Sequence, residues 1–406
     1  MSASAQRARR VVYLHIGEPK SATTFLQEVL WHNRAALARQ GVYLPGLHAQ
    51  EHFRATQDLR EVRQPADDPS GPWAGEWATL AGQAARTAGV SVISHELLAA
   101  ATAEQAARAV ASLQPAEVHI VLTVRDFGRL LPAEWQETVK HRNRQTWQRW
   151  VGRVIGGPDA PPRRRARWFW AVHDTAEVLR RWSADIPAER VHIVTVPRPG
   201  GPPELIWERF ASVIGVDPQG MDLSAARPNA SLGLAEVEAL RRLNVALGRD
   251  GLPDWFYAVH VKEALAHGVL AQRPATLRPV LRPRQADWAR SRATALIADL
   301  RDAGYDVVGD LAELLPAEQP DMPGRGARKG SAAAPAQAVL DAAVAALADV
   351  LRREYAAPHA TGAVGAGWAS STRAKQTARR LASRYAWARG LRRLAWRVGA
   401  KSGRRR

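Results

Sequence analysis

Four short runs of β-branched and other apolar residues limit the fold of this chain more than any other feature. They read VVYLHI (11–16), VSVIS (90–94), VHIVLTV (118–124) and VHIVTV (191–196). Nearly continuous apolar runs of this length are typical of strands buried on both faces of a parallel sheet. Stretches with helical spacing, such as residues 25–41 and 103–113, separate them. The alternation predicts an α/β fold of three layers, in which helices cover both faces of a central parallel sheet.

Changes in composition divide the 406 residues into four parts. Residues 1–10 are basic and lack an apolar pattern, which predicts a flexible N-terminus, and residues 11–316 hold all the predicted strands. Residues 317–336 are rich in Pro, Gly, Ala and charge, as linkers are. Residues 337–406 combine helical spacing with a basic end, and we expect them to form a helical, basic C-terminal extension.

The absence of cysteine bounds the chemistry and the compartment. Disulfides and cysteine-based zinc sites are excluded, and an oxidising compartment is not required. The apolar run after the basic N-terminus is broken at Gly17 and Glu18, so it is too short for the core of a signal peptide. No stretch reaches the roughly 18 apolar residues of a membrane-spanning helix. We therefore expect a cytoplasmic protein, with membrane association only at a surface.

The net charge of +18 is concentrated at the C-terminal end. Thirteen Lys and Arg residues follow Glu354, the last acidic residue, which leaves a net charge of +5 for the rest of the chain. In the tail (residues 373–406), four apolar side chains share one helical face, namely Trp387, Leu391, Leu394 and Val398. Such a helix suits peripheral contact with an anionic membrane or a partner protein, and a solvated tail that aids solubility is the alternative. Non-specific contact with nucleic-acid phosphates is also open, whereas no motif predicts specific nucleic-acid binding.

The first apolar run ends in the loop GEPKSATT (17–24), which has the chemistry of an anion site. A helix that begins after a buried strand exposes unpaired N–H groups and the positive end of its dipole. Lys20 adds a point charge, and three hydroxyls follow it, those of Ser21, Thr23 and Thr24. The pattern G-x-x-x-x-G-K-[ST] does not fit, because no glycine directly precedes the lysine, so a Walker-type NTPase is disfavoured. A plain turn with a surface lysine is the alternative.

Three segments, in this order, resemble those of PAPS-dependent sulfotransferases, where PAPS is adenosine 3′-phosphate 5′-phosphosulfate. GEPKSATTFLQ (17–27) resembles the family's 5′-phosphosulfate loop, whose usual form is G-x-P-K-[ST]-G-T-T. VISHELL (92–98) resembles the strand that carries a glutamate beside the acceptor in the carbohydrate-sulfating branch, and TVRDFGRLLPAEWQETVKHR (123–142) resembles the 3′-phosphate segment. Weaker blocks, such as FWAVHDTAEVLRRW (169–182), resemble bacterial members. The resemblance covers residues 11–316.

The resemblance implies a P-loop sulfotransferase-like fold and a sulfotransferase activity. A sulfuryl group would move from PAPS to a hydroxyl of a carbohydrate or carbohydrate-bearing metabolite by in-line displacement, leaving PAP. Lys20 would contact the bridging oxygen, and Arg125 would bind the 3′-phosphate. The implied 5′-phosphate contacts all come from the loop, namely Gly17, Pro19, Lys20, Ser21, Ala22, Thr23 and Thr24. No metal is implied.

A base is needed to take the proton of the acceptor hydroxyl. Glu96 is the first choice, because it matches the glutamate of the carbohydrate-sulfating branch and a carboxylate can accept that proton. His15 and His95 also stand at strand ends and are alternatives, as is a structural role for each residue. Since side chains alternate along a strand, His95 and Glu96 would face opposite sides if the strand continued.

Two positions depart from the family pattern. Ala22 replaces a glycine, and we expect binding to survive unless a positive φ is needed there. Ala133 replaces the serine of the 3′-phosphate site, eight residues after Arg125, a loss of about 1.5–3 kcal/mol that Arg129 or a backbone N–H would have to offset. These departures leave open a degenerate sulfotransferase-fold protein that binds a nucleotide or a partner without transfer. A P-loop kinase is a further alternative.

No specific motif marks the acceptor. Lys140 and Arg142 follow the 3′-phosphate segment on the next helix, where they would hold an anionic acceptor or belong to a solvated helix face. The expected partners are therefore a small-molecule, glycan or glycolipid acceptor, and the sequence indicates no oligomeric state.

Overall fold

The computed structural model describes residues 10–64, 72–156, 164–224, 231–248, 252–273, 277–317 and 334–356. The chain separates into two compact units, Met1–Ala343 and Val344–Arg406, and the sheet lies in the first. The predicted flexible N-terminus up to residue 9, most of the predicted linker and the basic tail at 373–406 lie outside the described residues.

A single sheet of six strands, all parallel, forms the centre of the first unit. Its order is β2-β3-β1-β4-β5-β6. The strands are β1 (Arg10–His15), β2 (Val42–Tyr43), β3 (Gly89–Ser94), β4 (Glu117–Val124), β5 (Val191–Thr195) and β6 (Asp306–Val308). The four apolar runs are β1, β3, β4 and β5, so the predicted parallel sheet is confirmed. The sequence did not predict β6, an edge strand of three residues.

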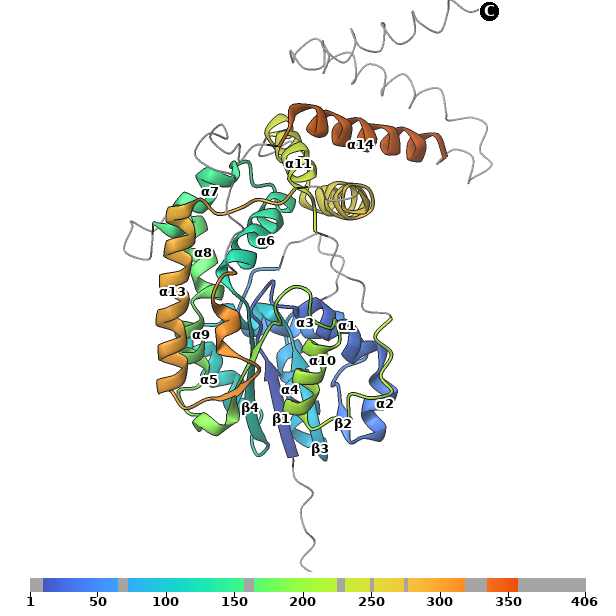
Figure 1. The fold of residues 1–406 in the computed structure, drawn as a ribbon. Helices are drawn as coiled ribbons and strands as arrows, with labels where there is room; N and C mark the ends of the chain where they lie inside the picture. The colour runs from blue at the N-terminus through green and yellow to red at the C-terminus, as the bar shows by residue number, and fades with distance from the viewer. Residues whose placement is uncertain are drawn as a thin grey trace, which may run out of the picture. The chain divides into compact units, whose positions relative to one another are not determined.

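Helices cover both faces of this sheet (Figure 1). On one face lie α3 (Ala49–Leu59), α4 (Glu76–Arg86), α5 (Ala103–Ser112), α9 (Thr175–Trp182) and α13 (Pro283–Asp302). On the other lie α1 (Thr23–His32), α2 (Arg34–Arg39) and α10 (Leu205–Ile214). Alternate residues of β4 enter the two cores: Ile120 and Leu122 pack on the first face, and Val121 packs on the second. The three-layer arrangement predicted from the sequence is present.

The strand order reverses between β1 and β4, the position at which open α/β sheets bind ligands. After β1 the chain moves toward β2 and β3, and after β4 it moves the other way toward β5. Loops that leave neighbouring strands in opposite directions open a crevice at their carboxyl ends. The loop at residues 17–22 follows β1 and Arg125 follows β4, so the topology brings the two predicted phosphate-binding segments together.

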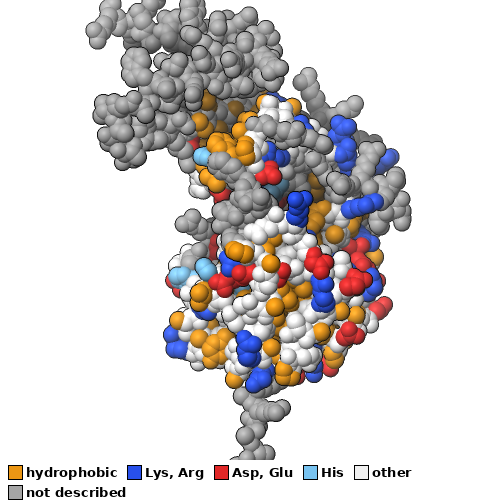
Figure 2. Space-filling view, turned by 180° about the vertical axis from the view of Figure 1, so that it is seen from behind, with side chains coloured by type: hydrophobic (Ala, Val, Ile, Leu, Met, Phe, Trp, Pro, Cys, Tyr) orange, Lys and Arg blue, Asp and Glu red, His pale blue; other side chains and the backbone are white. Residues whose placement is uncertain are grey.

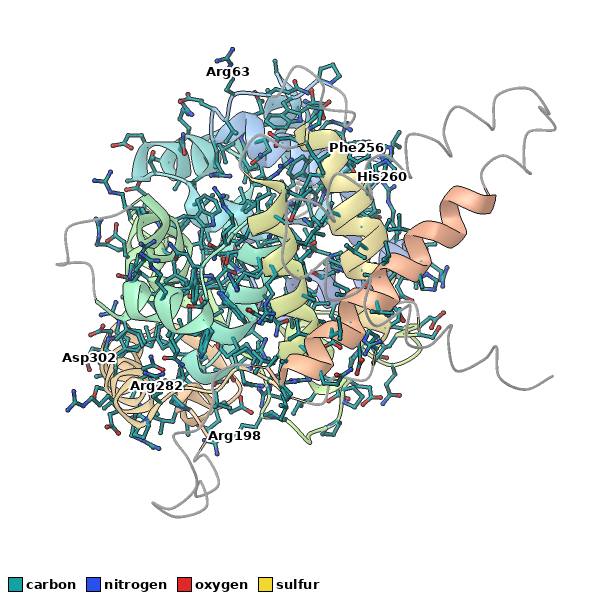
Figure 3. All side chains as sticks on the ribbon, turned by 90° about the horizontal axis from the view of Figure 1, so that it is seen from above. Arg63, Arg198, Phe256, His260, Arg282 and Asp302 are labelled. Carbon is teal, nitrogen blue, oxygen red and sulfur yellow. The ribbon has the colours of Figure 1, made fainter. Side chains whose placement is uncertain are left out.

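A group of helices lies over this carboxyl end. Figure 1 shows α6 (Phe127–Lys140), α7 (Trp147–Ile155) and α11 (Leu234–Leu247) there. The π-helix η3 (Tyr257–His267) contacts α6. Figure 3 shows this region from above, where the labels of Phe256 and His260 mark the helix. The remaining elements are η1 (Glu96–Ala100), α8 (Arg164–His173), η2 (Ala188–Arg190), α12 (Asp254–Phe256), η4 (Leu270–Gln272), η5 (Leu311–Leu314) and α14 (Ala336–Ala356).

The surface charge of the first unit is mixed. On the face drawn in Figure 2, acidic and basic side chains are interspersed rather than gathered by sign. This agrees with the small net charge that remains once the tail is set aside. Among the helices that the structure describes, none is long and apolar enough to cross a membrane.

Candidate functional site

The loop after β1 is fastened to the end of β4. Thr123 donates its backbone N–H to the carbonyl of Gly17 at 2.6 Å, and Glu18 donates its own N–H to the carbonyl of Thr123 at 2.8 Å. Gly17 has φ +113°, and a Cβ there would lie 3.1 Å from the carbonyl oxygen of Glu96. Both facts require glycine at this position. The loop therefore starts from a rigid, tightly packed base.

The loop then turns through two left-handed residues that are not glycine. Lys20 has φ +63° and Ala22 has φ +66°. The backbone at position 22 thus has the positive φ that the sequence-based expectation names as the condition against binding. The left-handed conformation costs an alanine roughly 1–2 kcal/mol. Ala22 directly precedes α1, and no side chain of the described residues caps that helix. The loop holds a strained backbone at an uncapped helix N-terminus, as anion sites do.

We expect Ala22→Gly to raise the free energy of unfolding by about 1 kcal/mol, because glycine adopts a positive φ without steric cost. Urea denaturation of the two proteins measures this difference. Ala107→Gly is the matched control, since Ala107 is exposed inside helix α5, where glycine should cost about 0.5–1 kcal/mol. If both substitutions destabilise the protein equally, Ala22 is not strained.

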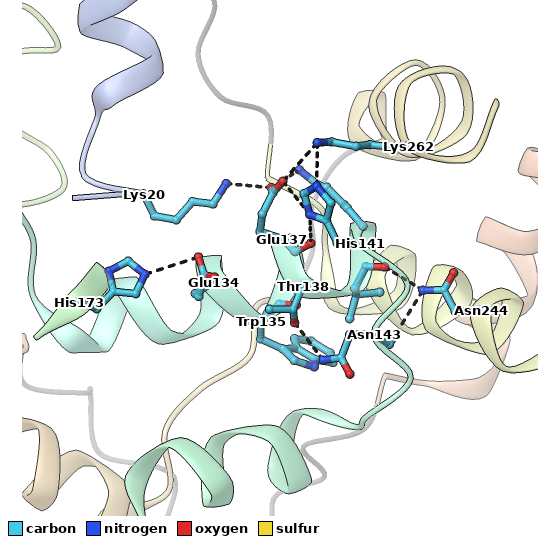
Figure 4. A network of polar contacts seen from close by, with 12 residues as sticks. Lys20, Glu134, Trp135, Glu137, Thr138, His141, Asn143, His173, Asn244 and Lys262 are labelled. Carbon is cyan, nitrogen blue, oxygen red and sulfur yellow. Dashed lines mark hydrogen bonds and ion pairs between the residues drawn. The ribbon is translucent and has the colours of Figure 1, made fainter. Parts of the chain in front are cut away.

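The ammonium group of Lys20 lies in a cluster of charged side chains from α6 and η3 (Figure 4). Its Nζ donates to Glu137 Oε2 at 2.8 Å. Lys140 Nζ lies 3.5 Å from the same oxygen, and Lys262 Nζ lies 3.7 Å from Glu137 Oε1. His141 Nδ1 lies 3.4 Å from Oε1, and Lys262 also donates to His141 Nε2 at 3.0 Å. One carboxylate therefore gathers three lysines from three separate elements.

The charges in this cluster perturb one another. Burial alone would raise the pKa of Glu137, but the nearby Lys20, Lys140 and His141 hold it far below its ordinary range. Burial lowers the pKa of Lys140. The carboxylate of Glu137 opposes this effect, and the charge of Lys20 adds to it. Burial and Lys262 lower the pKa of His141, so its imidazole is neutral at pH 7. Glu137 is thus ionised, and the lysines provide an excess of positive charge.

Arg125, at the end of β4, is a half-buried cation with no acidic partner among the described residues. Its Nη1 donates to the carbonyl of Lys20 at 2.9 Å, which joins the two predicted segments directly. Its Nε is buried without a hydrogen-bond partner, and no carboxylate of the described residues lies within ion-pair distance of its guanidinium. Burial, followed by repulsion from Arg129, lowers the pKa of Arg125 to about 10, so the side chain stays charged at pH 7. A charged guanidinium whose buried Nε has no partner retains bonding capacity for an anion.

Unlike Arg125, Arg129 has a hydrogen-bond partner for each of its side-chain nitrogens. Its Nε pairs with Asp126, and its two terminal nitrogens donate to the carbonyls of Pro197, at 2.7 Å, and Val196, at 3.2 Å. The guanidinium therefore ties α6 to the end of β5. The proposed compensation for Ala133, which is half-buried on α6, finds no support in these contacts.

A buried triad of charged residues lies behind the loop. Glu18, between Gly17 and Pro19, approaches His173 Nδ1 at 3.6 Å, and Glu134 of α6 approaches His173 Nε2 at 3.6 Å. Thr175 donates its hydroxyl to Glu18 as well. Although burial opposes it, the two carboxylates raise the pKa of His173 to about 9. The histidine is therefore protonated at pH 7, and its charge compensates the two buried carboxylates.

The hydroxyls predicted in the loop have different surroundings. Ser21 is fully buried, donates to the carbonyl of Glu18 and lies 3.0 Å from the hydroxyl of Thr123. Thr23 is buried, Thr24 is exposed and Pro19 is half-buried. Ser21 thus fastens the loop to β4, and its predicted phosphate contact stays a prediction, as do those of Pro19, Thr23 and Thr24.

The three candidate bases also differ in their surroundings and hydrogen bonds. His15 is buried between the hydroxyls of Ser94, at 2.7 Å, and Thr123, at 3.3 Å, and burial lowers its pKa to about 4. His95 caps η1 by accepting from the N–H of Leu97 at 3.2 Å. β3 ends at Ser94, so the strand alternation considered for His95 and Glu96 does not apply.

Glu96 is the candidate base that lies against the loop. It packs on Gly17 and accepts from Gln27 Nε2 of α1 at 3.0 Å. Burial would raise the pKa of Glu96, but His95, the bond from Gln27 and the charge of Lys20 together lower it. Glu96 is therefore an ionised carboxylate within the electrostatic reach of Lys20.

Sequence reasoning missed five residues of this site. They are Glu18, Glu134, Glu137, His173 and Lys262. The signal for Glu137 was present, because Glu137, Lys140 and His141 fall at i, i+3 and i+4 on one helical face. Glu18 was also conspicuous, since an acidic residue inside a phosphate loop needs a partner that turns it away. No local pattern pointed to Lys262.

Comparison of the chain with protein-family models, with curated proteins and with solved structures finds no match. A functional assignment therefore depends on the loop motif and on the geometry of Lys20 and Arg125. In the described part of the chain, no three His, Asp or Glu side chains are grouped so as to hold a metal ion.

Proposed function

We propose that this chain is a PAPS-dependent sulfotransferase with a P-loop sulfotransferase-like fold. One observation carries the proposal: Arg125, a half-buried arginine whose Nε is buried without a hydrogen-bond partner, donates to the carbonyl of Lys20 where the chain changes direction between β1 and β4. A cation at each of two adjacent strand ends suits a nucleotide that carries phosphates at both its 3′ and 5′ positions. The loop motif supports the same nucleotide.

The proposed chemistry needs positioning and charge neutralisation. The acceptor oxygen attacks sulfur, the bond from sulfur to the bridging oxygen breaks, and PAP leaves with the electron pair. Lys20 stabilises the negative charge that develops on this leaving oxygen. Because Lys20 contacts Glu137 in the free protein, it exchanges that carboxylate for the phosphosulfate when the donor binds.

Glu96 is the proposed base. It is a carboxylate beside the loop and within the field of Lys20, whereas both ring nitrogens of His15 and the Nδ1 of His95 are used in the contacts described above. Glu96 takes the proton of the acceptor hydroxyl as the oxygen attacks sulfur. The acceptor is a carbohydrate, a carbohydrate-bearing metabolite or a glycolipid. A cytoplasmic location, with membrane contact through the tail at 373–406, completes the proposal.

A binding protein without transfer activity is the second candidate, and the ion pair between Lys20 and Glu137 favours it. In that case Lys20 stays with Glu137 and the nucleotide binds through Arg125 alone. A P-loop kinase is a third candidate and differs in the nucleotide that it prefers.

Calorimetry with PAP, ADP and Mg²⁺-ATP tests the proposal. We expect PAP to bind most tightly and Arg125→Gln to weaken PAP by roughly 10- to 100-fold, the loss of one charged hydrogen-bonding group. The same substitution should leave ADP, which lacks the 3′-phosphate, almost unchanged. Arg180→Gln is the matched control, because Arg180 is exposed and its one ion-pair partner among the described residues is Glu177 on the same helix. Preference for Mg²⁺-ATP over PAP contradicts the proposal and favours a kinase.

A further inference from the structure

Half of the lysines in this chain meet at one carboxylate. The sequence has six lysines among 57 basic residues, so arginine is the usual cation by a wide margin. Yet Lys20 of the loop, Lys140 at the end of α6 and Lys262 of η3 all approach Glu137 within 2.8–3.7 Å. A lysine carries a compact point charge with rotatable donors, whereas the planar guanidinium of arginine is larger and more rigid. The choice of lysine at three converging positions indicates a small site with a specific geometry.

The cluster holds more positive charge than its own carboxylates balance. Lys20 pairs with Glu137 and acts on Glu96 only through its electric field, whereas Glu137 is the carboxylate that contacts Lys140 and Lys262. In the proposed reaction Lys20 moves to the donor. Two ammonium groups then share one carboxylate, and His141 between them is neutral. The side chains of Lys140 and Lys262 are only 9% and 26% exposed, so solvent screens this excess charge incompletely.

The two lysines are held by a rigid frame. Tyr257 of η3 donates its hydroxyl to Asn244 Oδ1 of α11 at 2.6 Å. Asn244 Nδ2 donates in turn to the carbonyl of Val139, next to Lys140, at 2.7 Å. The guanidinium of Arg142 stacks over the ring of Tyr257 at 4.1 Å. These contacts fix η3 against the end of α6, so Lys140 and Lys262 are preorganised rather than brought together by a ligand.

The other charged groups near the cluster do not neutralise it. His267 of η3 is within the field of Lys140 and Lys262, and burial and Lys140 lower its pKa. Glu263 lies on the same helix and acts on His267, but it is not within ion-pair distance of either lysine. Among the described residues, Glu137 is the only carboxylate within ion-pair distance of Lys140 and Lys262, so the two lysines can accept an anion from outside the chain.

We propose that Lys140 and Lys262 bind an anionic group of the acceptor, so that the acceptor is an acidic carbohydrate bearing a carboxylate, sulfate or phosphate group. The location next to Lys20 identifies this as the acceptor side of the site, and that identification rests on the proposed function. The anion binds beside Glu137, and the hydroxyl to be sulfated then faces the donor. Neutral sugars lack the group that the lysines recognise.

The test uses the full-length protein labelled with ¹⁵N at lysine, which gives only six side-chain signals. Glucuronate, glucose 6-sulfate and glucose 6-phosphate are titrated in the presence of PAP, with glucose as the neutral probe. We expect at least one charged sugar to shift the signals of Lys140 and Lys262, while glucose shifts neither. Which charged sugar binds most tightly identifies the anionic group.

Lys140→Gln with Lys262→Gln should lower the affinity for that sugar by at least about tenfold, through the loss of charged hydrogen bonds. Arg242→Gln, which removes an exposed charge from α11, should not change it. Equal shifts with glucose and the charged sugars, or an affinity for the charged sugar that is unchanged in the double variant, overturn the proposal.

The wild-type titrations remain decisive if the double variant fails to fold. The proposed function is tested separately by the effect of PAP on the Lys20 signal. If PAP leaves Lys20 unchanged while charged sugars shift Lys140 and Lys262, the anion site stands and its assignment to an acceptor of sulfuryl transfer is overturned.

Discussion

Replacing Lys20 with alanine is expected to slow sulfuryl transfer by about 10²- to 10³-fold, the usual loss when one group that stabilises transition-state charge is removed. In the proposed reaction, negative charge develops on the bridging oxygen as its bond to sulfur breaks. Lys20 is the cation of the loop after β1, and its carbonyl accepts a hydrogen bond from Arg125 at the end of β4. The affinity for PAP should fall far less, because PAP no longer carries the group being transferred. The effect is therefore expected mainly in kcat.

Hydrolysis of ³⁵S-labelled PAPS provides a measurement that does not depend on the acceptor. Water then serves as the acceptor, and the products are sulfate and PAP. Arg108→Gln is a suitable control, since Arg108 is an exposed residue of α5 that pairs with Glu61 away from the loop. Equal hydrolysis by the wild type and the Lys20 variant contradicts the assigned role. Binding of PAP without any hydrolysis by the wild type favours the binding protein.

A substitution of Glu137, the partner of Lys20, provides a second test of the same role. Lys20 contacts Glu137, so under the proposed function PAPS would compete with that carboxylate for Lys20. Glu137→Gln removes the competing charge and should tighten PAP binding, the opposite direction from Lys20→Ala. Opposite effects of the two substitutions indicate an exchange of partners, whereas a loss of PAP binding in both indicates that the pair is needed intact.

The sequence predicted the sheet well because the relevant signals are local. Each of the four apolar runs is a strand because β-branched residues buried on both faces suit a parallel sheet, and that property is visible within a few residues. The strand ends then located the loop at Lys20 and the arginine at 125. By contrast, β6 has three residues and gains its place by pairing with β5, a long-range contact that no local pattern encodes.

The charged surroundings of the site were harder to predict for the same reason. Glu137 meets Lys20 across 117 residues of sequence, and His173 meets Glu18 across 155. Pairings of this kind depend on how α6, α8 and η3 pack over the sheet. The backbone of Ala22 is another case, because its positive φ follows from the turn that fastens the loop to β4, not from the residue itself. Sequence identified which groups carry charge, and packing decided which of them meet.

His173→Gln should destabilise the protein by about 3–5 kcal/mol at pH 7, the usual cost of removing one partner from a buried ion pair. His173 is fully buried between Glu18 and Glu134, which are also buried. Without the imidazolium, both buried carboxylates lose their compensating charge. Urea denaturation measures the loss. His48→Gln is the control, because His48 is an exposed histidine that pairs with Glu51.

The pH dependence of stability distinguishes this charged role from simple packing. The pKa of His173 is about 9 in the folded protein, against 6.5 for an ordinary histidine, so the folded state binds the proton more tightly. Its contribution is complete below pH 6.5 and is lost as the pH rises through 9, an effect of about 3 kcal/mol. His15 and His52 act in the opposite sense, since burial lowers the pKa of each to about 4, and their contribution is lost in acid. The difference in unfolding free energy between wild type and His173→Gln should therefore shrink between pH 6.5 and 9.5. A difference that stays constant over this range contradicts a protonated His173 and leaves it a packing residue.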